Sequence, residues 1–170
     1  MNNRITVIAR AAAVVLTLQA GMALAQAEVK FVSPEKFSDA GESERDRDDA
    51  LKVLATHFEE QAAKQLPGKQ LKIEVKDVDL AGEIEPRGSG MQRIRVMRSA
   101  TIPRITLSYV LSEGGKELKR GDASLTDLSY QTATMVRYGP DDPMRYEKKL
   151  IDDWMSKELV GKPSSMAKGQ

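Results

Sequence analysis

Cysteine is absent from the 170-residue sequence, and its absence excludes several kinds of chemistry at once. Disulfide bonds, thiol catalysis, zinc sites with cysteine ligands and a lipid anchor on an N-terminal cysteine all require this residue. Histidine occurs once, at position 57, and no partner for a metal ion lies at ligand spacing around it. We therefore predict no metal site and no cofactor, and we interpret His57 as a surface residue.

A motif for nucleophilic catalysis is also lacking. A serine, histidine and aspartate triad would be expected together with a G-x-S-x-G turn, and the segment Gly88-Ser89-Gly90 does not have this spacing. On this basis we predict no catalytic residue of that type.

Neither sign of charge is in excess, because 26 basic side chains stand against 25 acidic ones, a formal net charge of +1. A balance of this kind does not indicate a nucleic-acid-binding protein. Aromatic residues make up only 5% of the chain and do not alternate with the arginines, so stacking platforms for bases are missing too. We predict no nucleic-acid partner.

Long hydrophobic runs are confined to the first 27 residues, which have the three parts of a secretory signal peptide. A basic start with Arg4 and Arg10 precedes an apolar run over residues 11–18, and small residues then allow cleavage after Ala25 or after Ala27. The alternative is an uncleaved anchor, but the apolar run is shorter than the ~20 residues that span a bilayer. We therefore expect a periplasmic protein with no membrane span after cleavage, a single domain over residues 28–160 and a disordered tail over 161–170.

Apolar and charged residues alternate from Leu71 to Leu80, a pattern typical of a half-buried strand. The alternation changes phase at Lys76 or Asp77, so we expect a β-bulge there. A helix precedes this strand. Ser43 with Asp46 is expected to form its capping box, and Pro67-Gly68 to end it. Its buried stripe is predicted to comprise Leu51, Leu54, Phe58, Ala62 and Leu66.

A short strand over residues 28–32 would lie parallel to residues 71–80, because a helix connects the two. Residues 85–103 lose the pattern, and we expect a long loop with at most a short edge strand around Ile94 and Val96. Residues 105–111 and 117–128 then form an antiparallel hairpin with a second phase change near Gly121, beyond which Leu118 would be buried.

A second helix is predicted to begin at Asp142-Pro143, with aspartate at the cap and proline at the first helical position. Tyr146 and Trp154 on its apolar face are interpreted as packing residues rather than a ligand cage. The order β-α-β-β-β-α predicts an α+β two-layer sandwich, with a mostly antiparallel sheet of four to five strands and both helices on one face.

Five phrases of the sequence together resemble the bacterial family called domain of unknown function 3016. They are VKFVSPEKFSDAG, DVDLAGEIEP, IPRITLSYVLSEGG, LTDLSY and DPMRYEKKLIDDW, and they extend from about Val29 to Leu159. The resemblance implies a single exported domain and supplies no catalytic residue.

Carboxylates gather at the end of the strand over residues 71–80. Asp77 and Asp79 project from one face and Glu83 follows shortly after, so these groups could hold a hard cation such as calcium or act as an acid and base pair. The alternative is the polar face of a half-solvated sheet. No calcium-loop spacing is present, which favours the alternative.

Arginines follow these carboxylates, and Arg95, Arg98 and Arg104 are candidate ligands for lipid phosphates, cell-wall carboxylates or an acidic partner protein. The alternative is a solvated loop, or pairing with the acidic start of the first helix. The first functional hypothesis is a non-catalytic binding or accessory protein that contacts an envelope protein or an anionic envelope component. The second is a periplasmic hydrolase that uses Asp77, Asp79 or Glu83.

Overall fold

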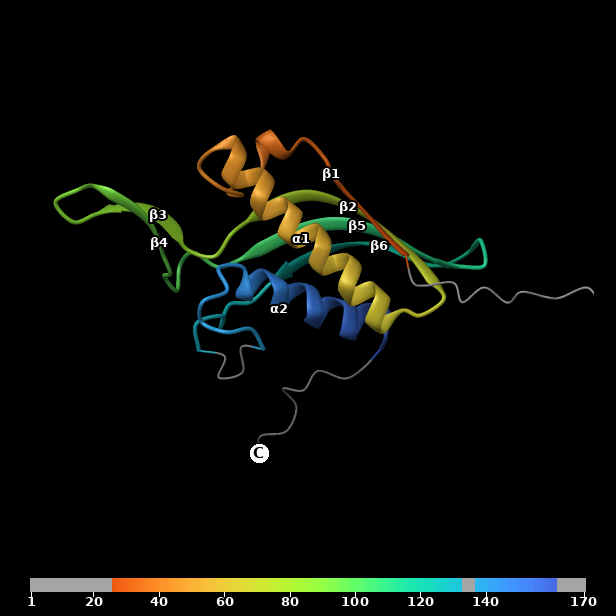
Figure 1. The fold of residues 1–170 in the computed structure, drawn as a ribbon. Helices are drawn as coiled ribbons and strands as arrows, with labels where there is room; N and C mark the ends of the chain where they lie inside the picture. Colours follow the sequence, from red (N-terminus) through yellow and green to blue (C-terminus); the bar gives the residue numbers. More distant parts are fainter. Residues whose placement is uncertain (1–25, 133–136, 162–170) are drawn as a thin grey trace, which may run out of the picture.

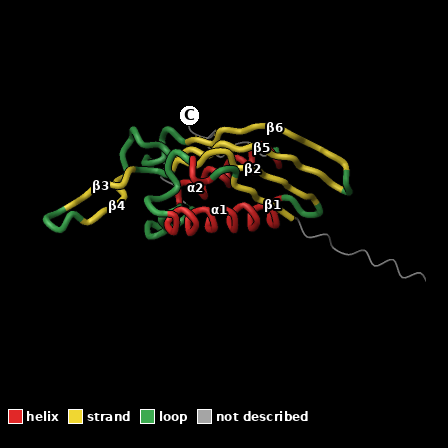
Figure 2. Tube along the Cα trace, turned by 90° about the horizontal axis from the view of Figure 1, so that it is seen from above, coloured by secondary structure: helices red, strands yellow, loops and turns green. Residues whose placement is uncertain are grey.

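The computed structural model describes residues 26–132 and 137–161, so nearly all of the predicted signal peptide and of the predicted tail lie outside the described residues. It confirms the α+β sandwich. A four-stranded sheet forms one layer and the two helices form the other, on one face of the sheet (Figure 1). A separate two-stranded hairpin extends beyond one end of this sheet in both views (Figure 2).

The main sheet has the strand order β1-β2-β5-β6. Strand β1 (Gln26–Phe31) pairs in parallel with β2 (Lys69–Asp79), as predicted from the helix that connects them. Strand β2 pairs antiparallel with β5 (Arg104–Glu113), and the register shifts between Val75 and Asp77. The predicted bulge is confirmed, and it turns Asp77 to the face of the sheet that the helices leave open.

Helix α1 (Glu44–Gln65) begins with the predicted capping box, because Ser43 accepts from the Asp46 N–H while the Asp46 carboxylate accepts from the Ser43 N–H. All five residues of the predicted stripe are buried. The stripe is wider than predicted, since His57 and Gln61 are buried as well. Before the helix, residues Pro34–Lys36 form a single 3-10 turn.

The expected loop over residues 85–103 is a hairpin in its first half. Strands β3 (Glu83–Arg87) and β4 (Gln92–Val96) pair antiparallel and form this projecting hairpin, which we call the arm. The short strand considered around Ile94 and Val96 is confirmed as β4, whereas β3 was not predicted. The turn between the two strands uses positive φ angles at Gly88 and Met91.

Strands β5 and β6 (Lys116–Thr126) form the predicted hairpin, but the second register shift lies opposite Leu111 and Ser112 rather than at Gly121. The extra residue in β6 is Leu118, and its side chain is 45% exposed, so the prediction that it is buried is wrong. Gly121 instead lies directly opposite Tyr109, whose ring comes so close that a Cβ atom would meet it at 3.2 Å.

Helix α2 (Arg145–Trp154) starts later than predicted. Asp142 does accept a hydrogen bond from the Met144 N–H at 2.9 Å, but it closes a turn before the helix and is not the helix cap. A π-helical turn over Met155–Leu159 continues the chain. Trp154 packs edge-on against Phe58 and Tyr109, as expected for a packing residue. Among the described helices none is long and apolar enough to cross a membrane.

Candidate functional site

The base of the arm brings together four segments of the chain: the end of β2, the loop before α1, strand β4 and helix α2. Asp77 accepts hydrogen bonds from Ser38, from the main-chain N–H at 2.8 Å and from the hydroxyl at 2.9 Å. One residue further on, Asp39 forms an isolated parallel bridge with Asp79. The loop before α1 is thus fastened along the end of β2.

Asp79 is the carboxylate whose environment departs most from that of a free side chain at this strand end. Burial raises the pKa of Asp79, and the charge of Asp39 raises it further, while Arg104 and Arg95 act in the opposite direction. Arg104 lies directly across from it on β5. The predicted carboxylates and arginines therefore do meet, in part as neighbours on two strands.

Arg95 connects the arm to the rest of the molecule. Its guanidinium group donates to both carboxylate oxygens of Asp39, at 2.7 and 3.2 Å, and to the Gly82 carbonyl at 3.0 Å. Only 20% of its side chain is exposed. A planar fork held by two oxygens in this way is a strong, well-oriented pair, so Arg95 has a structural role at the base of the arm.

Glu147 lies beneath the same point, on the first turns of α2, and only 1% of the residue is exposed. Its Oε1 accepts from the Ala81 N–H at 2.8 Å, while its Oε2 has no hydrogen-bond partner among the described residues. Burial raises the pKa of Glu147, although the Ala81 N–H and the charge of Arg95 oppose the shift. Sequence reasoning missed this residue. Its spacing of four and seven from Ile151 and Trp154 places it on the buried face of the helix.

The outer part of the arm is differently arranged. Arg98 donates twice to Glu85 Oε1, at 2.6 and 2.8 Å, and Arg87 donates to the other oxygen of Glu85 at 3.0 Å. Arg93 forms an ion pair with Glu42, next to the start of α1. The prediction that the arginines pair with the acidic helix start therefore holds for this residue.

Two apolar side chains of the arm are open to solvent, since Met91 is 69% and Ile94 46% exposed. Of the remaining predicted site residues, Glu83 and Arg104 are exposed, and neither forms an ion pair with a described residue. In the predicted set, Arg95 thus holds the arm and Asp77 fastens the loop before α1, Asp79 is partly buried between them, and the other residues are exposed.

His57 is not a surface residue, and this prediction is corrected. It is 5% exposed on α1, and its Nε2 lies 2.9 Å from Asp152 Oδ1 on α2. The other oxygen of Asp152 accepts from the Tyr138 hydroxyl at 2.7 Å and from Arg137 at 2.9 Å. Burial favours a higher pKa for Asp152, but hydrogen bonds from His57 and Tyr138 and the charge of Arg137 together lower it.

This second cluster could not be predicted from residue spacing, because 95 residues separate His57 from Asp152. A cleft of about 240 Å³ lies beside His57 and is bordered by Lys52, Thr56, Glu60 and Lys148. The cluster joins α1, α2 and the segment before α2. No set of three residues suited to hold a metal ion occurs within the described ranges.

The fold and the site define a small two-layer α+β domain with a projecting arm that is charged and partly apolar. The chain belongs to the family described as protein of unknown function (DUF3016), whose model matches residues 25–157. This match confirms the resemblance drawn from the sequence phrases. Comparisons with curated proteins and with solved structures found no match.

Proposed function

We propose that this chain is an exported, non-catalytic binding or accessory protein of the bacterial cell envelope, and that the outer part of the arm is its contact surface. The observation that carries the proposal is the exposure of Met91 and Ile94 on a hairpin that stands away from the sheet and helices (Figure 1). Apolar side chains that a protein keeps in water on a projecting element are typical of an interaction site.

The charge of the arm indicates the chemistry of the partner. From Glu83 to Arg98 the chain has four arginines and two glutamates, so the arm is positively charged within a nearly neutral protein. Arginine together with methionine and isoleucine suits a protein surface that offers carboxylates around an apolar patch. We therefore favour an acidic envelope protein as the partner over a lipid or a cell-wall anion.

The predicted arginines differ in their surroundings. Arg98 is 51% exposed and can donate to a partner as well as to Glu85, and Arg104 is exposed at the edge of the arm's base. Arg95 is committed to Asp39 and to the Gly82 carbonyl. Reversal of its charge would displace the arm rather than remove a single contact.

Export is supported by the N-terminal pattern of Arg4, Arg10 and the apolar run over residues 11–18, followed by small residues. A cleaved signal of this kind is most simply that of a bacterium with a periplasm. The hydrolase alternative stays a prediction. Asp77 is engaged by Ser38, and Glu83 lies open to solvent, so neither residue is in the apolar setting that a general acid usually occupies.

The test is site-specific photo-crosslinking in intact cells, with the photoreactive residue at Ile94. A matched control carries it at Val53, an aliphatic residue on α1 that is 39% exposed. We expect one defined protein adduct from position 94 and none from position 53, and a mature N-terminus at Gln26 or Glu28. R98E and R104E should each reduce the adduct at least about threefold, in keeping with the loss of an interface charge contact of roughly 1 kcal/mol.

Adducts of equal yield from both positions would contradict the arm as the contact surface. Adducts with lipid or glycan would contradict a protein partner and favour an anionic envelope component. A full-length N-terminus in the membrane fraction would contradict export with cleavage.

A further inference from the structure

Strand β6 forms one edge of the main sheet, and within the described ranges no segment pairs with its outer side. It is the longer of the two edge strands, with 11 residues against 6 in β1. An open edge presents main-chain N–H and C=O groups that can pair with another strand. We propose that β6 pairs antiparallel with β6 of a second copy of this chain, around a two-fold axis through Gly121.

The direction of the main-chain groups follows from the hydrogen bonds at the other side of the sheet. The Val32 N–H donates to the Val75 carbonyl at 2.9 Å, so the main-chain groups of Val75 face β1. In antiparallel strands, paired residues point their main-chain N–H and C=O groups alternately toward and away from each other. Followed from Val75 through the paired residues of β2, β5 and β6, this alternation places the N–H and C=O groups of Gly121 toward β5. The groups of Arg120 and Asp122 therefore face the open edge.

Charge complementarity selects the register. With the axis at Gly121, residues equally far before and after it face each other, so Arg120 lies opposite the partner's Asp122 and the reverse. An axis through Arg120 or Asp122 would place like charges opposite each other, and an axis through Lys119 would do the same. Among these central positions only Gly121 brings opposite charges together, and it does so twice.

These charges already belong to ion pairs that the dimer would extend. Lys76 lies 2.6 Å from Asp122, and Arg120 lies 2.6 Å from Glu117, all on solvent-exposed side chains. In the dimer, Lys76 and Asp122 of one copy would be followed by Arg120 and Glu117 of the other copy, so that positive and negative charges alternate across the interface. A network of this kind is more stabilising than an isolated surface pair.

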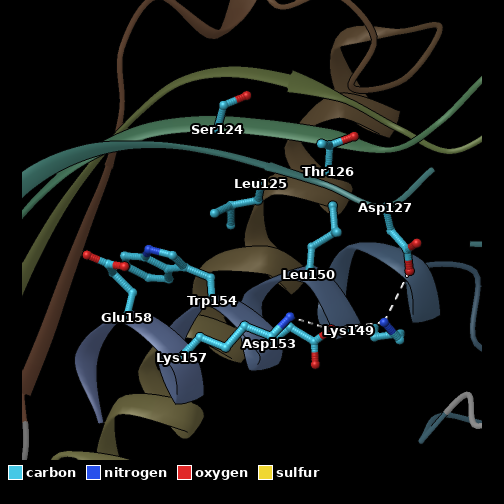
Figure 3. A pocket seen from close by; sticks show the side chains of 10 residues that line it. All are labelled: Ser124, Leu125, Thr126, Asp127, Lys149, Leu150, Asp153, Trp154, Lys157 and Glu158. Carbon is cyan, nitrogen blue, oxygen red and sulfur yellow. Dashed lines mark hydrogen bonds and ion pairs between the residues drawn. The ribbon is translucent and has the colours of Figure 1, made fainter. Parts of the chain in front are cut away.

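The same register sets the surroundings of the exposed Leu118. The partner's Leu118 would lie opposite Ser124, whose side chain points away from α2 (Figure 3). Paired residues of an antiparallel ladder project to the same face, so this leucine would lie on the face of the sheet that the helices leave open. On the other face, a cleft of about 300 Å³ lies between the end of β6 and α2, and its apolar lining comes from Leu125, Leu150 and Trp154.

The charged residues that border the cleft are already neutralised within the chain. Lys149 lies 3.1 Å from Asp127 and 3.0 Å from Asp153, and Glu158 lies 2.6 Å from Lys119. The cleft therefore brings no unpaired charge to the proposed interface.

The first test is analytical ultracentrifugation of the purified protein over about 1 to 100 μM, the range in which a dimer with a micromolar Kd dissociates. We expect a dimer for the wild type. R120D and D122R should each weaken association at least about tenfold, because both place two like-charge pairs in the interface. The double variant R120D/D122R should recover association in part, because it restores opposite charges across the axis but not the pairs with Lys76 and Glu117. K30E on the opposite edge strand should change nothing.

The second test uses the absence of cysteine. Leu118 and Ser124 are about 20 Å apart within one strand, so L118C/S124C cannot form a disulfide inside one chain. In the dimer the two positions face each other, and mild oxidation should give a covalent dimer. The control L118C/T126C is out of register by two residues and should not cross-link. A monomeric wild type throughout the range, or equal cross-linking of both pairs, would overturn the proposal.

Discussion

At the scale of the residue, Glu147 is the most deeply buried charged side chain among the described residues. It is buried at the base of the arm with one oxygen bonded to the Ala81 N–H and the other without a described partner. Burial raises its pKa, so the neutral form is favoured by folding. Its contribution to stability is full below the pKa of the unfolded chain and is lost as the pH rises through the higher pKa of the folded protein.

We predict that E147Q stabilises the protein at neutral and alkaline pH and has little effect in acid. Glutamine keeps an acceptor for the Ala81 N–H and removes the ionisation, which costs about 1.4 kcal/mol for each unit by which the pKa is raised. The check is the thermal midpoint as a function of pH, with E59Q on the exposed face of α1 as the control. A lower midpoint for E147Q at pH 8 would show that the ionised carboxylate is favourable where it lies.

At the scale of the element, the arm depends on a glycine at its base. Gly82 has a φ of +78°, and a Cβ atom there would lie 2.6 Å from the Val96 carbonyl oxygen. Gly88, in the turn at the tip, has a φ of +71° with nothing within 4 Å of the same position. The two glycines share a backbone conformation that favours glycine and differ in the space around them.

We predict that G82A destabilises the arm strongly, whereas G88A costs only about 1 kcal/mol for the positive φ. The added methyl group of G82A meets backbone on the paired strand, which cannot move without breaking the β3–β4 pairing. Amide hydrogen exchange of β3 and β4 checks this result. Equal loss of protection in the two variants would mean that conformation alone, and not the close approach of Val96, makes glycine necessary.

Element-scale features also show how far the sequence can be interpreted. The bulge near Lys76, the capping box at Ser43 and the parallel pairing of β1 with β2 were all predicted, because each follows from local spacing or from one connecting helix. The arm was predicted only in part, as a short strand around Ile94 and Val96, because β3 has no alternation that would reveal its partner strand. The clamp between Arg95 and Asp39 joins residues 56 apart, and spacing alone cannot select that pair from the other arginines.

At the scale of the whole molecule, the cluster around Asp152 joins α1, α2 and the segment that precedes α2. The pKa of Asp152 is lowered by His57, Tyr138 and Arg137 against the effect of burial. Its contribution to stability is therefore present above the pKa of the unfolded chain and is lost as the pH falls through the lower pKa of the folded protein. Acid should weaken the contact between the two helices.

We predict that H57A lowers the free energy of unfolding at neutral pH by about 3 kcal/mol, because it leaves Oδ1 of the buried Asp152 without its hydrogen-bond partner. Y138F removes one hydrogen bond and should cost about 1 to 2 kcal/mol. Urea unfolding at pH 7 and pH 3 checks both values, and the difference from the wild type should shrink at pH 3. A constant difference at the two pH values would mean that His57 stabilises the core by packing alone.

The attachment of the arm has a mechanical consequence. Leu80–Gly82 is the whole connection between β2 and β3, and it is held from one side by the Arg95 pair with Asp39 and from the other by Glu147. A load applied at the tip would act on these few polar bonds before it reached the long ladders of the main sheet. Tension on the arm would therefore break the polar bonds at its base first, while the main sheet and the two helices stayed folded.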